Sequence, residues 1–144
     1  MRSRRRMDLD RELALRYLAA RGIVLPQAAL EWGERLCRSY DSAESLIALV
    51  LPWFREGLQD DERCIWQLGR GFTVAAARRA LGTVAEFTVD QVDIVEADAP
   101  IDWAREETRA LGQGYRGLRV GGERLHALGG LGRRTKTLCF CTAG

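Results

Sequence analysis

Several side chains of this sequence could together bind a small organic molecule. Cysteine sulfur is soft and polarisable and suits an apolar ligand, and tyrosine and tryptophan rings can form an aromatic wall beside it. An arginine can bind an anionic group of the ligand, because its guanidinium presents several donors in one plane. The candidate ligand-binding residues of these types, together with one carboxylate, are Cys37, Tyr40, Cys64, Trp66, Arg119 and Glu123.

Each of these residues also has a structural interpretation, and the sequence leaves both open. A buried cysteine packs as a small hydrophobic residue, and aromatic residues in strands commonly belong to a core. Arg119 alternates with Leu118 and Val120, so it points away from one apolar face. It can form an ion pair with Glu123 or Glu96 instead of meeting a ligand.

Catalysis and metal binding receive little support from the sequence. The chain has four cysteines and a single histidine, His126, and no Cys-x-x-Cys pair. A closed zinc site would need cysteines from distant segments, and a cysteine nucleophile would have to use His126 as its base. We predict a protein that is not an enzyme and that carries no metal and no cofactor.

The elements that position these residues follow an α/β pattern. Asp41, with Glu44 as its capping-box partner, predicts the start of one helix, and Thr73 caps a second. Pro100 opens a third helix that runs to about Leu111. Strands and helices that alternate in this way imply right-handed crossovers and a mainly parallel sheet. Four short apolar runs predict the strands, at 36–40, 63–68, 92–95 and 117–121.

The position of the candidate site follows from this arrangement. Ligands of open α/β sheets bind beyond the carboxyl ends of the strands. The segments expected to meet at that rim are 40–41, 68–71, 96–98 and 121–123. We therefore expect a ligand to bind at this edge of the sheet.

The two ends of the chain differ from its centre in charge. Four arginines lie within residues 2–6, and Arg133, Arg134 and Lys136 follow a glycine-rich stretch. The net charge of +2 therefore combines basic ends with an acidic centre, which argues against a nucleic-acid-binding face across the whole domain. The Arg2–Arg6 arm could contact nucleic acid or an anionic surface, or serve as a solubilising tail.

Composition also predicts how the chain is divided. Residues 1–32 are expected to form a basic arm and an N-terminal helix, residues 33–124 the α/β domain, and residues 125–144 a weakly ordered, glycine-rich and basic tail. No apolar run is long enough to span a membrane. No export signal is visible, so we expect a cytoplasmic protein with free thiols.

Four blocks of sequence carry a family resemblance: GERLCRSY at 33–40, LPWFREGL at 51–58, DERCIW at 61–66 and GYRGLRVGGE at 114–123. Each block alone is a weak signal, but the ordered set is specific and spans most of the predicted α/β domain. In these blocks the chain resembles the MEDS family, the sensory domain of methanogens and methylotrophs named for the dichloromethane-dehalogenation regulator.

This resemblance implies a three-layer α/β fold with a RecA-like core, similar to circadian clock ATPases but without a working phosphate loop. The residues agree, because a phosphate loop needs glycines followed by Lys-Ser or Lys-Thr at a helix start. The turn at 40–44 instead offers the carboxylates of Asp41 and Glu44, and the only lysine is Lys136.

The resemblance also implies a function. It predicts a non-catalytic sensory domain for a small organic molecule, acting in bacterial or archaeal signalling or transcriptional regulation. Such domains feed a DNA-binding or kinase-like partner, so a regulatory protein partner or a homodimer is expected.

Three departures from the family pattern leave an alternative open. Arg35 stands where the family has a histidine; it joins the candidate ligand-binding residues, but its guanidinium has no free lone pair with which to coordinate a metal. The connection from Glu96 to Trp103 is short, and glycines replace an aromatic helix after Glu123. The alternative is a divergent adaptor that has lost the ligand site and acts through protein–protein contacts.

Overall fold

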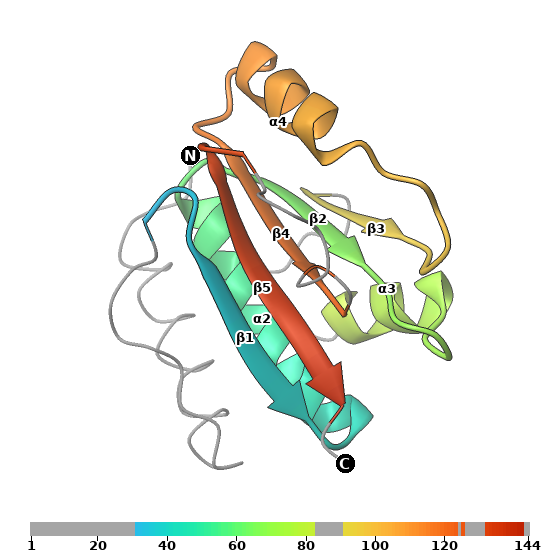
Figure 1. Ribbon diagram of the computed structural model, residues 1–144. Helices are drawn as coiled ribbons and strands as arrows, with labels where there is room; N and C mark the ends of the chain where they lie inside the picture. Colours follow the sequence, from blue (N-terminus) through green and yellow to red (C-terminus); the bar gives the residue numbers. More distant parts are fainter. Residues whose placement is uncertain (1–30, 83–90, 124, 126–131, 143–144) are drawn as a thin grey trace.

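The structure is a computed structural model that describes residues 31–82, 91–123, 125 and 132–142. The strands within these ranges form one five-stranded sheet (Figure 1). They are β1 (Arg35–Tyr40), β2 (Arg63–Gln67), β3 (Val92–Val95), β4 (Leu118–Gly122) and β5 (Thr135–Thr142). The helices within these ranges are α2 (Ala43–Gln59), α3 (Val74–Gly82) and α4 (Trp103–Gly112).

Every strand pair in this sheet is parallel, and the strand order is β1-β5-β4-β2-β3. The predicted parallel α/β fold is therefore confirmed. The first four strands agree with the apolar runs to within one residue at each end. Because all strands run the same way, their carboxyl ends lie at a single edge of the sheet.

The helices pack against the sheet through alternating strand residues. Trp66 of β2 and Phe140 of β5 share a buried cluster with the apolar side of α2, which lies behind the sheet in Figure 1. Neighbouring residues of a strand point to opposite faces. Accordingly, Ile65 and Val120 join Ala110 of α4 in a second buried cluster.

The start of α2 differs from the prediction. Ser42, rather than Asp41, is the N-cap, and its hydroxyl accepts a hydrogen bond from the backbone N–H of Ser45 at 3.1 Å. Ser45 also replaces Glu44 as the reciprocal partner, because it occupies the third helical position and its hydroxyl accepts from the N–H of Ser42. Asp41 accepts from the Ser45 hydroxyl at 3.0 Å, so its carboxylate supports the cap from outside the helix.

Of the other two predicted helix starts, one is correct. Thr73 caps α3, since its hydroxyl accepts a backbone hydrogen bond in the first turn at 3.1 Å. α4 begins at Trp103 rather than at Pro100, because the side chain of Asp102 accepts a first-turn N–H at 3.1 Å and caps the helix there. The residues around Pro100 therefore belong to the connection between β3 and α4.

The C-terminal segment overturns a second prediction. Instead of a weakly ordered tail, residues 135–142 form β5, which lies between β1 and β4. Its first six residues are buried. The glycine and arginine residues before it made this segment look like a loop. In the structure Leu138 and Phe140 face the α2 cluster, while Cys139 faces the other cluster. The sheet therefore extends beyond the domain boundary expected at residue 124.

The N-terminal expectation has a different outcome. The predicted basic arm and the helix within residues 1–32 lie outside the described residues, except for Glu31 and Trp32. The Trp32 ring lies 4.4 Å from the Lys136 ammonium and 4.9 Å from the Arg134 guanidinium. A cation over an aromatic face is attracted by the ring quadrupole. Trp32 therefore packs on the start of β5.

If β5 is an interior strand, Phe140→Ala should destabilise the fold strongly. The ring is 1% exposed, so its removal leaves a cavity that costs about 3–5 kcal/mol in the free energy of unfolding. Thr142→Ala, at the exposed end of the same strand, should change that free energy by less than about 0.5 kcal/mol. Urea denaturation followed by circular dichroism measures both. Equal, small effects would contradict an interior position for β5.

Candidate functional site

Three of the predicted ligand-binding residues are packed in the interior. Cys64 and Trp66 on β2 and Arg119 on β4 are all at most 2% exposed. The Trp66 ring packs near the rings of Phe54 and Phe72, whose centroids are 6.3 and 5.8 Å from its own. These contacts support the structural interpretation of the aromatic residue, with Trp66 as part of the core.

Arg119 forms a buried ion pair with Glu62. Its Nε donates to Oε1 of Glu62 at 2.6 Å, and its Nη1 donates to the carbonyl oxygen of Trp53 at 2.9 Å. The guanidinium carbon lies 4.4 Å from the centre of the Trp53 ring. The second oxygen of Glu62 accepts from the Lys136 ammonium at 2.8 Å. A structural ion pair of Arg119 therefore exists, but with Glu62 instead of either predicted partner.

The interior around this ion pair is filled. A Cβ placed on Gly57 would come within 2.5 Å of the Arg119 side chain and 2.9 Å of the Cys64 sulfur. The Cys64 thiol lies within hydrogen-bonding reach of the backbone oxygens of Phe54 and Glu62, at 3.7 and 3.6 Å. Burial raises the pKa of this thiol well above its usual value. Cys64 is therefore not a reactive thiol.

The remaining predicted residues lie nearer the surface. Arg35 and Cys37 are exposed on β1. Tyr40, at the carboxyl end of β1, reaches across to Glu123 after β4, and its hydroxyl donates to the Glu123 carboxylate. The structure thus brings Tyr40 and Glu123 together at the carboxyl end of β1, while Arg35 and Cys37 lie earlier on the same strand.

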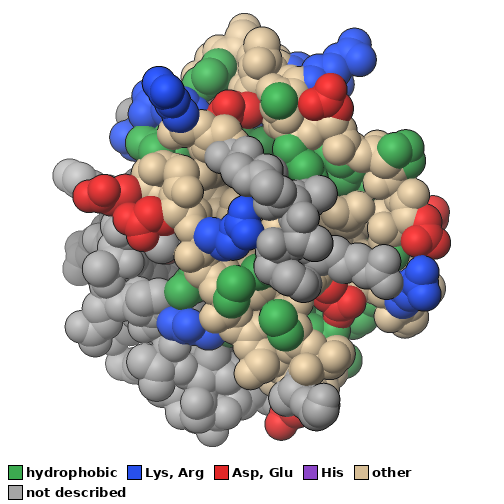
Figure 2. All heavy atoms as spheres, in the orientation of Figure 1, with side chains coloured by type: hydrophobic (Ala, Val, Ile, Leu, Met, Phe, Trp, Pro, Cys, Tyr) green, Lys and Arg blue, Asp and Glu red, His purple; other side chains and the backbone are tan. Residues whose placement is uncertain are grey.

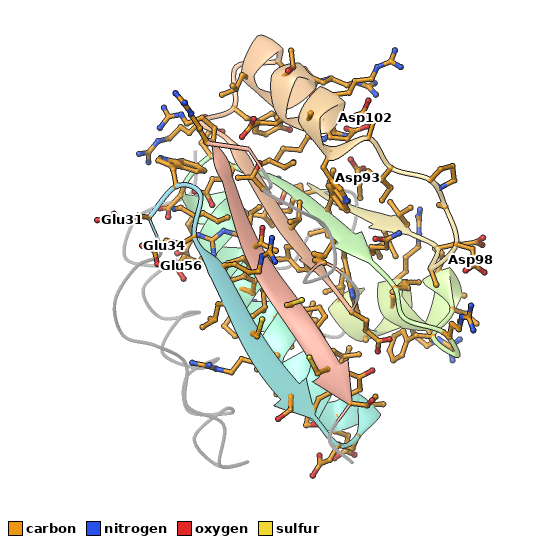
Figure 3. All side chains as sticks on the ribbon, viewed as in Figure 1. Glu31, Glu34, Glu56, Asp93, Asp98 and Asp102 are labelled. Carbon is orange, nitrogen blue, oxygen red and sulfur yellow. The ribbon has the colours of Figure 1, made fainter. Side chains whose placement is uncertain are left out.

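A pocket of about 320 Å³ opens at the carboxyl edge of the sheet. It is formed by the loop after β2, the connection from β3 to α4, and the residue that follows β4. In Figure 3, Asp98 lies at this edge, beyond the arrowheads of β2 and β3. The lining residues are Gln67, Leu68, Gly69, Arg70, Ala97, Asp98, Ala99, Ile101, Trp103 and Glu123.

The pocket agrees with the rim predicted from the sequence. Segments 68–71, 96–98 and 121–123 each contribute to its lining. Of the seven predicted ligand-binding residues, however, only Glu123 lines it. Gln67, Arg70 and Trp103 were missed as individual residues, although the carboxyl-end rule indicated two of the loops that carry the lining.

Two local features shape the pocket. The Gln67 amide donates to the carbonyl oxygens of Ala97 and Ala99 at 3.4 and 3.3 Å, which ties the connection after β3 to the end of β2. On the other side, the carboxylate of Glu123 lies directly against Gly69, where a Cβ would come within 2.1 Å of it. A side chain at position 69 would therefore push the Glu123 carboxylate away from its present position.

The lining combines apolar and charged groups. Ile101 and Trp103 supply apolar surface, and Arg70, Asp98 and Glu123 supply one positive and two negative side chains. Pockets that bind small molecules have volumes of about 300–1,000 Å³ and combine apolar walls with a few polar groups. The pocket has the size and lining of a small-molecule site.

A second, wider pocket of about 600 Å³ lies between α4 and the β2–β3 part of the sheet. Arg63 in its lining donates to Asp93 at 2.8 Å and to Glu106 at 2.7 Å. A ligand there would have to compete with these ion pairs. We therefore take the pocket at the carboxyl edge as the candidate site.

The described ranges contain no helix long and apolar enough to cross a membrane. Within the same ranges, no group of three or more histidine, cysteine or acidic side chains is arranged to hold a metal ion. The chain matches no protein-family model, no curated protein and no solved structure. The resemblance to the MEDS family therefore stays a prediction from its four sequence blocks.

Replacing Glu62 with glutamine should destabilise the fold by about 3–5 kcal/mol, because it removes the one buried carboxylate charge that two buried cations share. Those cations are Arg119 and Lys136. Glu56→Gln is the matched control, since Glu56 is 3.8 Å from Arg119 but 29% exposed, and we expect a loss below about 1 kcal/mol. Urea denaturation at neutral pH compares the two variants. Similar losses would contradict a special role for Glu62.

Cys64 should differ sharply from Cys37 and Cys141 in its reaction with iodoacetamide. Cys37 and Cys141 are exposed, whereas Cys64 is buried and burial raises the pKa of its thiol. Since only the thiolate is alkylated, Cys64 should be modified only after unfolding in urea. Peptide mass spectrometry of folded and unfolded samples locates the label. Rapid labelling of Cys64 in folded protein would show that the interior beside Arg119 is open.

Proposed function

We propose that this chain is a non-catalytic ligand-binding domain for a small organic molecule, acting in bacterial or archaeal signalling or transcriptional regulation. The observation that carries the proposal is the pocket of about 320 Å³ at the carboxyl ends of β2, β3 and β4. Ligands of open parallel sheets bind at this edge, because the connecting loops there can vary without disturbing the core.

The lining favours a ligand with an apolar body and a few polar groups. Trp103 and Ile101 offer the apolar contact. The carboxylates of Asp98 and Glu123 accept hydrogen bonds, while Arg70 donates them. A molecule that carries both a donor and an acceptor next to a short hydrocarbon fragment would engage all three charged residues.

The charge on the surface favours a small molecule over nucleic acid. Figure 2 shows basic and acidic side chains of the described residues interspersed over the face in view, and on that face they form no continuous patch of one charge. Nucleic-acid-binding faces instead gather lysine and arginine into one stripe. Contact of the Arg2–Arg6 arm with nucleic acid or an anionic surface stays a separate hypothesis, since that arm lies outside the described residues.

The wider proposal is a sensory domain of the MEDS type, with a three-layer, RecA-like core and no phosphate loop. Two local observations support the lack of nucleotide hydrolysis. The only lysine, Lys136, forms a buried ion pair with Glu62. In addition, the turn after β1 uses the side chains of Ser42 and Ser45 to cap α2 and carries Asp41 beside them, so it opposes an incoming phosphate.

The adaptor alternative rests on a different surface. Leu111 at the end of α4 and Tyr115 just after it are large hydrophobic residues that are 42% and 37% exposed. Exposed apolar side chains that cluster can mark a protein-binding surface. An adaptor or a homodimer would use this end of α4, whereas a sensor requires the pocket at the opposite end of the helix.

Ligand-induced stabilisation tests the proposal. We expect one class among small aldehydes, haloalkanes, fatty acids and nucleotides to raise the Tm of the wild-type protein. A ligand at a hundred times its Kd stabilises by about 2.7 kcal/mol, or about 5–10 °C in a domain of this size. Thermal denaturation with and without each compound gives the shift.

The pocket is distinguished from other surfaces by two variants. Ala97→Leu places added atoms inside the pocket, so it should abolish the shift while the Tm without ligand stays close to that of the wild type. Arg109→Ala, in the second pocket, should retain the shift. No shift with any class, or an unchanged shift in Ala97→Leu, would count against the proposal. Self-association that Tyr115→Ala removes would then favour the adaptor.

A further inference from the structure

Three of the four cysteines lie on one face of two neighbouring strands. Cys37 is on β1, and Cys139 and Cys141 are on β5. Leu36 and Leu138 face the cluster that contains α2, so the cysteines that follow them in sequence point to the other face. Figure 3 shows sulfur atoms in yellow over β1 and β5 on the viewer's side of the sheet.

The register of the two strands places one pair of thiols directly opposite each other. Cys37 pairs with Cys139, and Ser39 pairs with Cys141, in the parallel ladder between β1 and β5. Neighbouring strands lie about 4.7–4.9 Å apart, and disulfides join residues whose Cα atoms are about 4.4–6.8 Å apart. The strand spacing therefore places the Cα atoms of Cys37 and Cys139 within the range that a disulfide requires.

The same strand geometry disfavours a disulfide from Cys141 to either of the other two thiols. Cys141 is two residues beyond Cys139, which amounts to about 6.6 Å along the strand and about 8 Å diagonally from Cys37. Both separations leave the Cβ atoms well beyond the roughly 3.5–4.5 Å that a disulfide needs. Cys64 points to the opposite face, into the α2 cluster. Only Cys37 and Cys139 are suitably placed.

The two opposed thiols differ in access to solvent. Cys37 is exposed, while Cys139 is fully buried. An exposed thiol can attack a small disulfide from solution, and a neighbouring thiol can then resolve the mixed disulfide. The pair therefore has the two parts of a thiol–disulfide exchange site, one reachable from outside and one held beside it.

We propose that Cys37 and Cys139 form a reversible disulfide site that responds to small-molecule disulfides. The Cys37 thiolate attacks one sulfur of the oxidant, which forms a mixed disulfide and releases one thiolate of the reagent. The Cys139 thiolate then attacks the Cys37 sulfur, which closes the Cys37–Cys139 bond and releases the second reagent thiolate. The two protein thiols are oxidised, and one reagent disulfide is reduced to two thiols, which take up the two protons that the protein thiols lose.

Closing this bond would fix β1 to the interior of the sheet. β1 pairs with β5 and, among the described strands, with no other. Its last residue, Tyr40, donates to Glu123 at the rim of the candidate pocket. The disulfide site therefore lies on β1, the strand whose Tyr40 binds the Glu123 carboxylate in the wall of the pocket. The disulfide proposal depends neither on the identity of a ligand nor on the proposed ligand-binding function.

Mass spectrometry after exposure to oxidised glutathione tests this site. The reduced, folded protein is treated, quenched with acid and compared with the variants Cys37→Ser, Cys139→Ala and Cys141→Ser, whose folding is checked by circular dichroism. We expect Cys141→Ser, which lacks the other exposed thiol, to lose two hydrogen masses, and Cys37→Ser and Cys139→Ala to form no such internal bond. In the wild type the same loss is read from the linked Cys37 and Cys139 peptides, because glutathione can also add to the exposed Cys141. Chymotrypsin, which cleaves after Phe140, separates Cys139 from Cys141 and should release a linked Cys37–Cys139 peptide pair.

Several outcomes would overturn the inference. Glutathione that remains attached to Cys37 in the wild type would show that Cys139 cannot reach it. A linked peptide that contains Cys141 would show that Cys139 is not the partner of Cys37. A Cys37–Cys139 bond that forms only in urea would be a property of the unfolded chain. Failure of this test leaves the ligand-binding proposal unaffected. That proposal is tested by the Tm shifts of Ala97→Leu and Arg109→Ala, and both variants keep the three thiols.

Discussion

One buried carboxylate holds the centre of this sheet together. Glu62, 1% exposed just before β2, accepts from Arg119 on β4 and from Lys136 on β5. Isolated charges in a protein interior are costly, and a pair becomes tolerable only when each charge is bound by the others and by hydrogen bonds. Without Glu62 two cations would face each other across neighbouring strands. The ion pair of Glu62 with Lys136 stabilises β5 in its place between β1 and β4.

This arrangement explains where a ligand can and cannot bind. The guanidinium of Arg119 donates hydrogen bonds to Glu62 and to the Trp53 carbonyl oxygen, so we do not expect it to bind a ligand. Around it Gly57 leaves no room for even a methyl group. The centre of the sheet is filled, so the pocket for a small molecule lies at the carboxyl edge instead. At that edge the Glu123 carboxylate lies close to Gly69 in the loop after β2.

Local sequence signals predicted the local features of this fold. The apolar runs located β1 to β4, Thr73 located the start of α3, and the parallel pattern located the rim where the pocket opens. Apart from the starts of α2 and α4, which were placed too early in the chain, the errors concern contacts between distant residues. Glu62 meets Arg119 across 57 positions and Lys136 across 74, and no local pattern announces such a pair. β5 was missed because glycine and arginine residues precede it, and because its basic residue, Lys136, is accommodated in an interior strand by the distant Glu62.

The molecule combines a filled interior with a pocket at the rim, and a crystallographic fragment screen tests that separation most directly. Crystals of the full chain are soaked with a library of small organic fragments, and the bound positions are located by difference density. We expect fragments among Gly69, Asp98 and Glu123, with none in the interior. Fragments bound between Trp66 and Arg119, with the rim empty, would contradict this division of the molecule.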